Sequence, residues 1–104
     1  MQEPTAVAPI GGLKILPTGS RVTFAGQVIR CFERQGKRRG LLGDESGFIQ
    51  VEGPGVEDLR RGNNVKIEHG LLKRHPTHEE IIHLDRDSRV DLLKEPVEVK
   101  RLPR

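Results

Sequence analysis

The sequence predicts an all-β protein, a five-stranded Greek-key barrel with one short helix between its third and fourth strands. A chain of 104 residues suits one domain. Its 12 Gly and 7 Pro, with few long apolar runs, favour short strands and turns over a helical bundle. The order of the segments (a strand, a basic loop, a hairpin and two further strands) is that of a small closed barrel.

The barrel is expected to occupy residues 13–93. Residues 1–12 carry two prolines and a Gly-Gly pair without a sustained period, which indicates a flexible N-terminal lead-in. Residues 94–104 contain two more prolines and mixed charge, so they are expected to form a loosely held C-terminal tail.

The first strand is predicted from Arg21 to Phe32, where apolar residues alternate with polar ones. Gly26 weakens a strand interior unless the backbone bends sharply there. A small barrel needs such a bend, because its first strand serves both halves of the closed sheet.

The second and third strands are predicted over residues 38–43 and 48–52, joined by a turn at Asp44–Gly47. The period does not decide whether Leu41 or Leu42 points inward. In the third strand the period of two separates an apolar, β-branched face from an outward face. The inward pair is Ile49 and Val51, and the outward residues are Phe48, Gln50 and Glu52.

The second half of the domain continues the same pattern. Residues 56–62 suit one helical turn, with acids early, bases late and a terminal Gly. A fourth strand alternates through Val65 and Ile67, and a polar loop follows at residues 73–78. The fifth strand runs through residues 81–84 and is expected to resume at residues 89–92. With the third strand, the fourth and fifth supply the predicted core: Ile49, Val51, Val65, Ile67, Ile82 and Leu84.

The charges are distributed unevenly along the chain. Residues 30–39 hold five cations against one anion, whereas residues 79–98 hold seven acids against three bases. The net charge of +3 permits an anionic partner without requiring one. One side of the fold should therefore be basic and another acidic.

Several functional classes find no support in the sequence. A single Cys31 excludes an internal disulfide and fits a reducing compartment. No apolar run approaches the ~20 residues of a membrane span, so an intracellular protein is expected (nuclear in a eukaryote, in the cytoplasm or nucleoid of a prokaryote). Asp44 and Glu45 are adjacent turn residues, Ser46 has no neighbouring His, and no phosphate loop or dinucleotide motif is present. We therefore expect no catalysis and no cofactor.

Four histidines raise the question of a metal site. His75 and His78 lie three apart in one loop, but that loop contains no Cys and no third ligand. A structural zinc site needs four ligands, so no metal is expected. The loop histidines are expected to add adjustable positive charge beside Lys73 and Arg74.

Four segments, taken in order, resemble the oligonucleotide/oligosaccharide-binding (OB) domains of replication protein A and its small accessory subunits. The similarity spans residues 13–92. It is carried by Val22-Thr23-Phe24-Ala25-Gly26-Gln27-Val28, Gly43-Asp44-Glu45-Ser46-Gly47-x-Ile49-x-Val51, Leu59-x-x-Gly62-x-x-Val65-x-Ile67 and Ile82-His83-Leu84-Asp85-Arg86-Asp87-Ser88-Arg89-Val90.

The resemblance implies a single-stranded nucleic-acid module, with DNA favoured over RNA, of the replication, repair or telomere-maintenance type. In that family single-stranded DNA lies between the first–second and fourth–fifth strand loops, here residues 33–37 and 73–78. Phosphates would meet the cations of these loops. If Ile49 and Val51 face inward, Phe48 points outward beside the basic loop, where it either stacks on a base or caps the barrel end or a subunit contact. The expected contact residues are Arg34, Lys37, Arg38, Arg39, Phe48, Gln50, Lys73 and Arg74.

The chain departs from the family in its aromatic content. It has no Trp and no Tyr, and Glu52-Gly53-Pro54 and Arg38-Arg39 stand where family members carry stacking aromatics. Because stacking contributes ~1–3 kcal/mol per base, its loss would leave mostly salt-sensitive backbone contacts.

This departure keeps other functions open. The first alternative is an OB subunit that acts through protein–protein contacts in a replication protein A-like or telomere-capping complex. Leu92-Leu93 and Val97-Val99 would be candidate docking pairs for its protein partner. An anticodon-binding domain is a third, lower-ranked interpretation, because Gly47-Phe48-Ile49-Gln50-Val51 also resembles the third strand of those domains.

Overall fold

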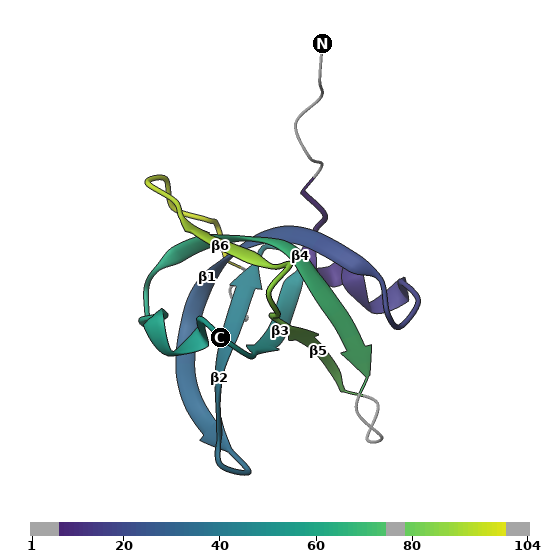
Figure 1. Cartoon of the computed structure of the whole chain (residues 1–104). Coiled ribbons are helices and arrows are strands. Elements are labelled where there is room, and N and C mark those ends of the chain that lie inside the picture. The colour runs from purple at the N-terminus through teal and green to yellow at the C-terminus, as the bar shows by residue number, and fades with distance from the viewer. Residues whose placement is uncertain (1–6, 75–78, 100–104) are drawn as a thin grey trace.

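The computed structural model describes residues 7–74 and 79–99. Within them, six strands form one sheet in the order β1-β2-β3-β5-β4-β6, and β1 also pairs with β4, so that the sheet closes (Figure 1). The elements are η1 (Ile10–Ile15), β1 (Arg21–Arg34), β2 (Lys37–Asp44), β3 (Gly47–Glu52), η2 (Val56–Asp58), β4 (Asn64–Arg74), β5 (Glu80–His83) and β6 (Arg89–Leu92). None of the helices in the described ranges is long and apolar enough to cross a membrane.

The fifth strand is interrupted, as the sequence predicted. β5 pairs with the far end of β4 (Leu71–Arg74), and β6 pairs with its beginning (Val65–Glu68). Both lie on the same side of β4, so β5 and β6 together supply the fifth position of the barrel. The all-β, five-stranded prediction is confirmed, and the short helix between the third and fourth strands is the 3₁₀ turn η2.

The N-terminal segment contributes more than was expected from its sequence. Ile10 and Leu13 of the 3₁₀ helix η1 are fully buried in the core. The packed part of the domain therefore extends at least to Ile10, inside the predicted lead-in. Its Gly-Gly pair gave no helical period from which η1 could be predicted.

A hairpin carboxylate fastens η1 to the barrel. Asp44 Oδ2 accepts a hydrogen bond from Ile10 N (3.0 Å), and Asp44 Oδ1 accepts one from Ser46 N (2.7 Å). Ser46 Oγ in turn accepts from Gly11 N (2.7 Å). The Asp-Glu-Ser-Gly turn is thus also the N-terminal anchor.

β1 bends where it passes from one half of the barrel to the other. Its first half pairs with β4 and its second half with β2, and Gln27 has a partner in both strands. A Cβ at neighbouring Gly26 would lie 3.2 Å from both Ile10 Cδ1 and Leu42 Cβ. Glycine at this position therefore permits the close approach that closure requires.

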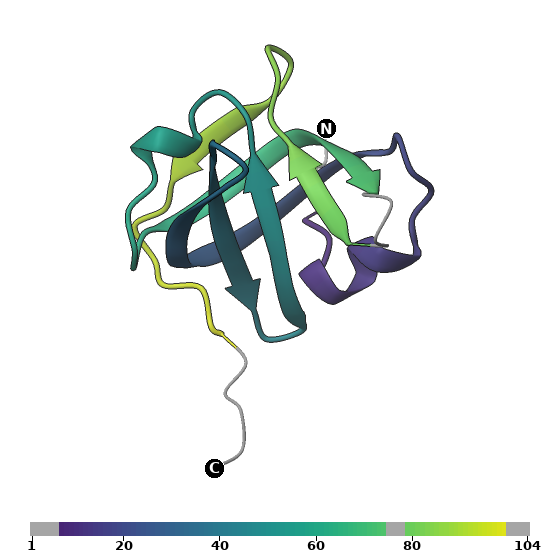
Figure 2. The ribbon, with the colours of Figure 1, turned by 90° about the horizontal axis from the view of Figure 1, so that it is seen from below.

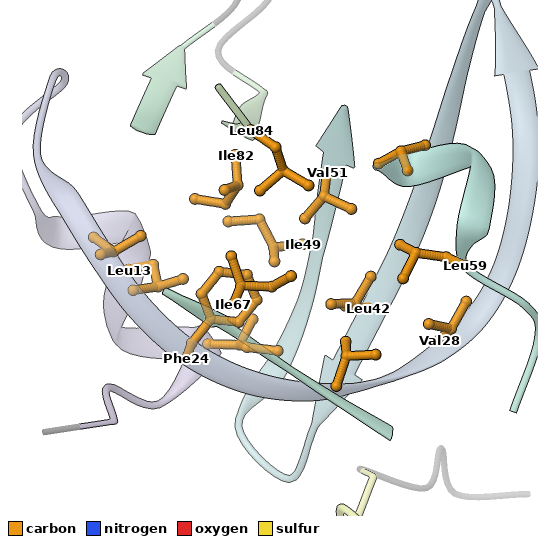
Figure 3. Packing of buried hydrophobic residues seen from close by; sticks show 14 of the residues in the cluster. Leu13, Phe24, Val28, Leu42, Ile49, Val51, Leu59, Ile67, Ile82 and Leu84 are labelled. Atoms are coloured by element: carbon orange, nitrogen blue, oxygen red, sulfur yellow. The ribbon is translucent and has the colours of Figure 1, made fainter. Parts of the chain in front are cut away.

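Aliphatic side chains from all five barrel positions meet in the interior (Figure 3). Each of the six residues predicted as core is at most 4% exposed. The choice left open in β2 is also settled, because Leu42 is fully buried and Leu41 lies on the outer side. The alternation in β3 is as predicted, with Ile49 and Val51 inside.

An ion pair ties the start of β1 to the turn between β5 and β6. Arg21 donates to both carboxylate oxygens of Asp85, at 2.9 and 2.8 Å. The hydrogen bonds from Arg21, together with the backbone N–H of Asp87, lower the pKa of Asp85 to about 2. The turn is therefore held in place by a carboxylate that stays ionised at neutral pH.

Val51→Asp tests the inward face of β3. The side chain is fully buried, so the variant would place an unpaired carboxylate in the core and lower the free energy of unfolding by about 3 kcal/mol or more. Circular dichroism melting should show loss of the cooperative transition. Ile15→Asp is the matched control: Ile15 is 86% exposed, and a change within about 0.5 kcal/mol is expected. A wild-type melting temperature for Val51→Asp would show that the strand faces are assigned wrongly.

Candidate functional site

The outward side chains of β2 and β3 form one continuous surface, here called the β2–β3 face: Arg39, Leu41, Phe48, Gln50 and Glu52. The strand register places Leu41 opposite Gln50 and Arg39 opposite Glu52. β5 continues the sheet beyond β3, so β2, β3 and β5 lie side by side (Figure 2). The predicted outward orientation of Phe48 and Gln50 agrees with their intermediate exposure, which alternates with the buried Ile49 and Val51.

The basic loop is a hairpin turn that projects at one edge of this face (Figure 1). Gln35 and Gly36 both have positive φ, 54° and 76°, as a tight two-residue turn between twisted strands requires. The flanking side chains of Arg34, Lys37 and Arg38 are exposed. Three predicted phosphate contacts therefore stand together at the hairpin tip.

The hairpin lies next to Glu79, the residue that directly precedes β5. Arg34 Nη1 is 3.3 Å from Glu79 Oε2, and this ion pair connects the hairpin to the start of β5. Both side chains are roughly half exposed, so this ion pair contributes only ~0–1 kcal/mol to the free energy of unfolding. Arg34 can therefore exchange Glu79 for another anionic partner. Residues 75–78, with the predicted loop histidines His75 and His78, lie outside the described residues.

Arg39 does not serve as an exposed cation, contrary to the prediction. Its side chain is 6% exposed, and its Nη1 donates to Gln50 Oε1 (3.1 Å) while its Nη2 lies 3.4 Å from Glu52 Oε1. Glu52 Oε2 also lies 3.1 Å from His83 Nδ1 on β5. We call these four residues the central polar network. The guanidinium is committed to this network and is unavailable to a phosphate.

Arg74 is likewise committed to the protein itself. It donates to Thr18 Oγ1 (2.8 Å) and to the backbone oxygens of Lys14 and Leu16 (both 2.7 Å). Its function is to fix the segment between η1 and β1 against β4. Neighbouring Lys73 is exposed and remains a candidate phosphate contact.

Phe48 forms part of the floor of a shallow pocket on the β2–β3 face. A Cβ placed on the opposite residue, Gly43, would lie 2.6 Å from the Phe48 ring, so the ring covers the backbone at that glycine. The pocket has a volume of about 140 Å³, and Leu41, Phe48 and Gln50 line it. Its other lining residues include one cation and two acids: Lys14, Glu79 and Glu80.

β1 extends the face with two residues that were not predicted as contacts. Arg30 pairs with Leu41, and Phe32 pairs with Arg39 in the β1–β2 ladder. The Arg30 guanidinium lies 4.9 Å from the centre of the Phe32 ring, within cation–π range. A register shift between Val28 and Arg30 re-aims these side chains, and strand periodicity alone does not reveal such a bulge.

The described residues contain no group of three or more His, Cys, Asp or Glu side chains that could hold a metal ion. His69 and His83 are on β4 and β5. His83 Nδ1 lies 3.1 Å from Glu52 Oε2, within the central polar network.

The chain is similar in structure to several solved OB domains. The OB domain of MM0293 from Methanosarcina mazei superposes with a TM-score of 0.70 at 22% identity, with 86% of each chain covered. Pot1pC of Schizosaccharomyces pombe, solved bound to single-stranded DNA, gives 0.66 at 11% identity over 86% of this chain and 87% of that one. A murine DNA-binding protein solved with double-stranded DNA gives 0.71 at 17% identity; this chain covers 50% of its length.

No protein-family model and no curated protein sequence matches the chain. The structural similarities therefore establish the OB fold and leave its function to be argued from the site.

The committed role of Arg39 can be tested by comparing two adjacent arginines. Arg39→Ala would leave the carboxylate of Glu52, 14% exposed, without its cation, and should lower the free energy of unfolding by about 3 kcal/mol. Arg38→Ala, at an exposed position, should change it by less than about 0.5 kcal/mol. Urea denaturation measures both. Equal stability of the two variants would contradict the assignment of Arg39 to the central polar network.

Proposed function

We propose that this chain is a non-catalytic, single-stranded nucleic-acid-binding module that holds its ligand across the β2–β3 face. One observation carries the proposal: three exposed cations at the hairpin tip stand beside a face with a half-exposed aromatic ring in a shallow pocket. Cations that follow the backbone and a ring that stacks on a base are the two components of single-strand recognition. Two structurally similar proteins were solved with DNA, Pot1pC with a single strand and the murine protein with a duplex, and they support nucleic-acid binding in general.

The shape of the face favours a single strand over a duplex. Phe48 lies on the strand surface itself, in a pocket of only about 140 Å³. A ring in such a position can stack only on a base whose face is exposed, and in a duplex both faces are stacked on neighbouring bases. We favour DNA over RNA, in a replication, repair or telomere-maintenance setting.

Binding of this kind should be weak and strongly salt-dependent. Of the six predicted cationic contacts, Arg39 and Arg74 are committed within the protein. Arg34, Lys37, Arg38 and Lys73 remain, which gives a maximum of about four phosphate contacts from the predicted set. Arg30 on β1 lies beside the same face and is a further candidate.

The charges of the rim favour a second candidate, an OB assembly subunit that acts through protein contacts. Glu79 already pairs with Arg34, and Glu79 and Glu80 both line the pocket. These carboxylates would repel a phosphate backbone that passes close to them. A protein surface with alternating charges would not meet this difficulty.

Salt titration tests the cationic hairpin. With about three to four phosphate contacts, log affinity for poly-dT should fall against log salt with a slope of about −2 to −3. Replacing Arg34, Lys37 and Arg38 together with Ala should reduce that slope by about 2 and weaken all sequences alike, because phosphates carry no base information. Fluorescence anisotropy at several salt concentrations gives both quantities.

A matched variant separates local contacts from net charge. Replacing Arg61, Arg86 and Lys94 with Ala removes the same charge from exposed positions outside the hairpin. Its slope should stay within error of the wild-type value. An equal reduction of the salt slope in both triple variants would show that the hairpin acts only through the net charge of the protein. If the wild-type protein binds no single strand at low salt and micromolar concentration, the assembly subunit is favoured instead.

The role of Phe48 is tested without removing its packing. Phe48→Leu keeps an apolar side chain over Gly43 but removes the aromatic face, and should weaken single-strand binding by about 1–2 kcal/mol with an unchanged salt slope. Phe48→Tyr keeps the ring and should bind nearly as wild type. If Phe48→Leu also binds as wild type, Phe48 packs against the barrel and takes no part in binding.

A further inference from the structure

We propose that the outer edge of β6, together with the apolar pocket beside it, is a docking site for an extended peptide segment of a partner protein. The partner strand would add to the sheet next to β6 and place one aliphatic side chain in the pocket. This surface is separate from the β2–β3 face and goes beyond nucleic-acid binding.

The first observation is an open strand edge. Within the described residues β6 pairs only with β4. In an antiparallel ladder the backbone groups of successive residues point alternately to opposite edges. Leu93 N donates to Asn64 O of β4 (2.7 Å), so the alternation turns the backbone groups of Val90 and Leu92 away from β4. These groups can pair with an added strand.

The second observation is a pocket on the barrel-interior side of that edge. Val90 and Leu92 lie opposite the buried residues Ile67 and Val65, so their side chains point to the interior side of the sheet. η2 is only three residues long and buries Val56 alone. A pocket of about 380 Å³ remains between η2 and β6 and reaches down to Leu59.

The exposure of Leu92 shows that, among residues 7–74 and 79–99, no side chain covers this apolar surface. Its side chain is 71% exposed although it continues the row of core residues on β4 and β6. Leu59, in the same pocket, is 2% exposed and supplies an apolar base. An aliphatic side chain that entered here would extend the core cluster outward and remove Leu92 from water.

The walls of the pocket favour a single extended chain over a folded domain. Pro54, Gly55 and Asp58 line the side opposite β6, so the open edge faces a groove and not free solvent. A second copy that offered its own β6 would bring its own η2 turn against these walls.

The charges define the partner further. Asp58 makes no ion pair within the described part of the chain, and it stands at the pocket rim next to exposed Glu57. On the other side of β6, Arg89 and Asp91 neutralise each other at 3.0 Å. The fitting segment therefore carries Val, Leu or Ile beside Lys or Arg, with polar residues at the alternate positions.

A displayed library of short linear peptides tests the proposal on the full chain. Selection against wild-type protein should enrich the aliphatic–basic pattern. Synthetic versions of the enriched peptides should bind with micromolar Kd by fluorescence anisotropy, and backbone N-methylation at alternate positions should weaken them about tenfold, because each removes a ladder hydrogen bond.

Three variants distinguish specific binding at this site from nonspecific hydrophobic binding. Leu92→Asn, at an exposed position, should weaken the peptides about tenfold, and Asp58→Asn should weaken those with the basic residue. Ile15→Asn removes an even more exposed apolar residue, at the end of η1, and should leave the Kd within about twofold. Poly-dT affinity should not change with Leu92→Asn.

Each contrary result overturns the proposal. No enriched peptide, peptides that bind Leu92→Asn as tightly as wild type, or indifference to N-methylation would exclude strand addition at β6. Analytical ultracentrifugation adds one further outcome: a wild-type dimer that becomes a monomer in Leu92→Asn would assign the edge to a second copy of the chain instead.

Discussion

The structure depends on the ability of one strand to belong to two halves of a closed sheet. β1 pairs with β4 over its first half and with β2 over its second, and the change of partner falls at Gly26 and Gln27. Any side chain at Gly26 would press on Ile10 and Leu42 at 3.2 Å, so both the closure and the seating of η1 rely on a missing Cβ. Without this passage the two halves would present open edges and a divided core.

Closure also determines which side chains can meet a ligand. Because the interior is filled by apolar residues, the polar residues of β2 and β3 must point outward, where they form the β2–β3 face together with Leu41 and Phe48. The second half of β1 continues past the barrel with β2 as a hairpin, which carries its cations to the edge of that face. The position of the basic loop is thus a consequence of the length of β1.

The sequence was sufficient for the properties that depend on local periodicity. Ile49 and Val51 were placed inside and Phe48 and Gln50 outside by alternation alone, and the interrupted fifth strand followed from two short apolar runs. Local periodicity could not predict which of the cationic side chains remain accessible to a ligand. The three acceptors of Arg74 lie 56 to 60 residues earlier in the chain, and Arg39 meets Glu52 only through the β2–β3 register. η1 was missed because two glycines conceal a helix whose stability comes from burial of Ile10 and Leu13.

The central polar network explains why a basic OB domain need not be a strong binder. Arg39 and Glu52 lie at the middle of the face and neutralise each other, so the centre offers shape and hydrogen-bonding groups but little net charge. The exposed cations stand at the hairpin edge, and Glu79 and Glu80 lie beside the pocket. A strand attracted to the hairpin would then have to displace Glu79 from Arg34 before its bases reached Phe48. In the proposed function, electrostatic attraction and base stacking would therefore be coupled through one exposed ion pair, whose small contribution to stability makes it suited to exchange.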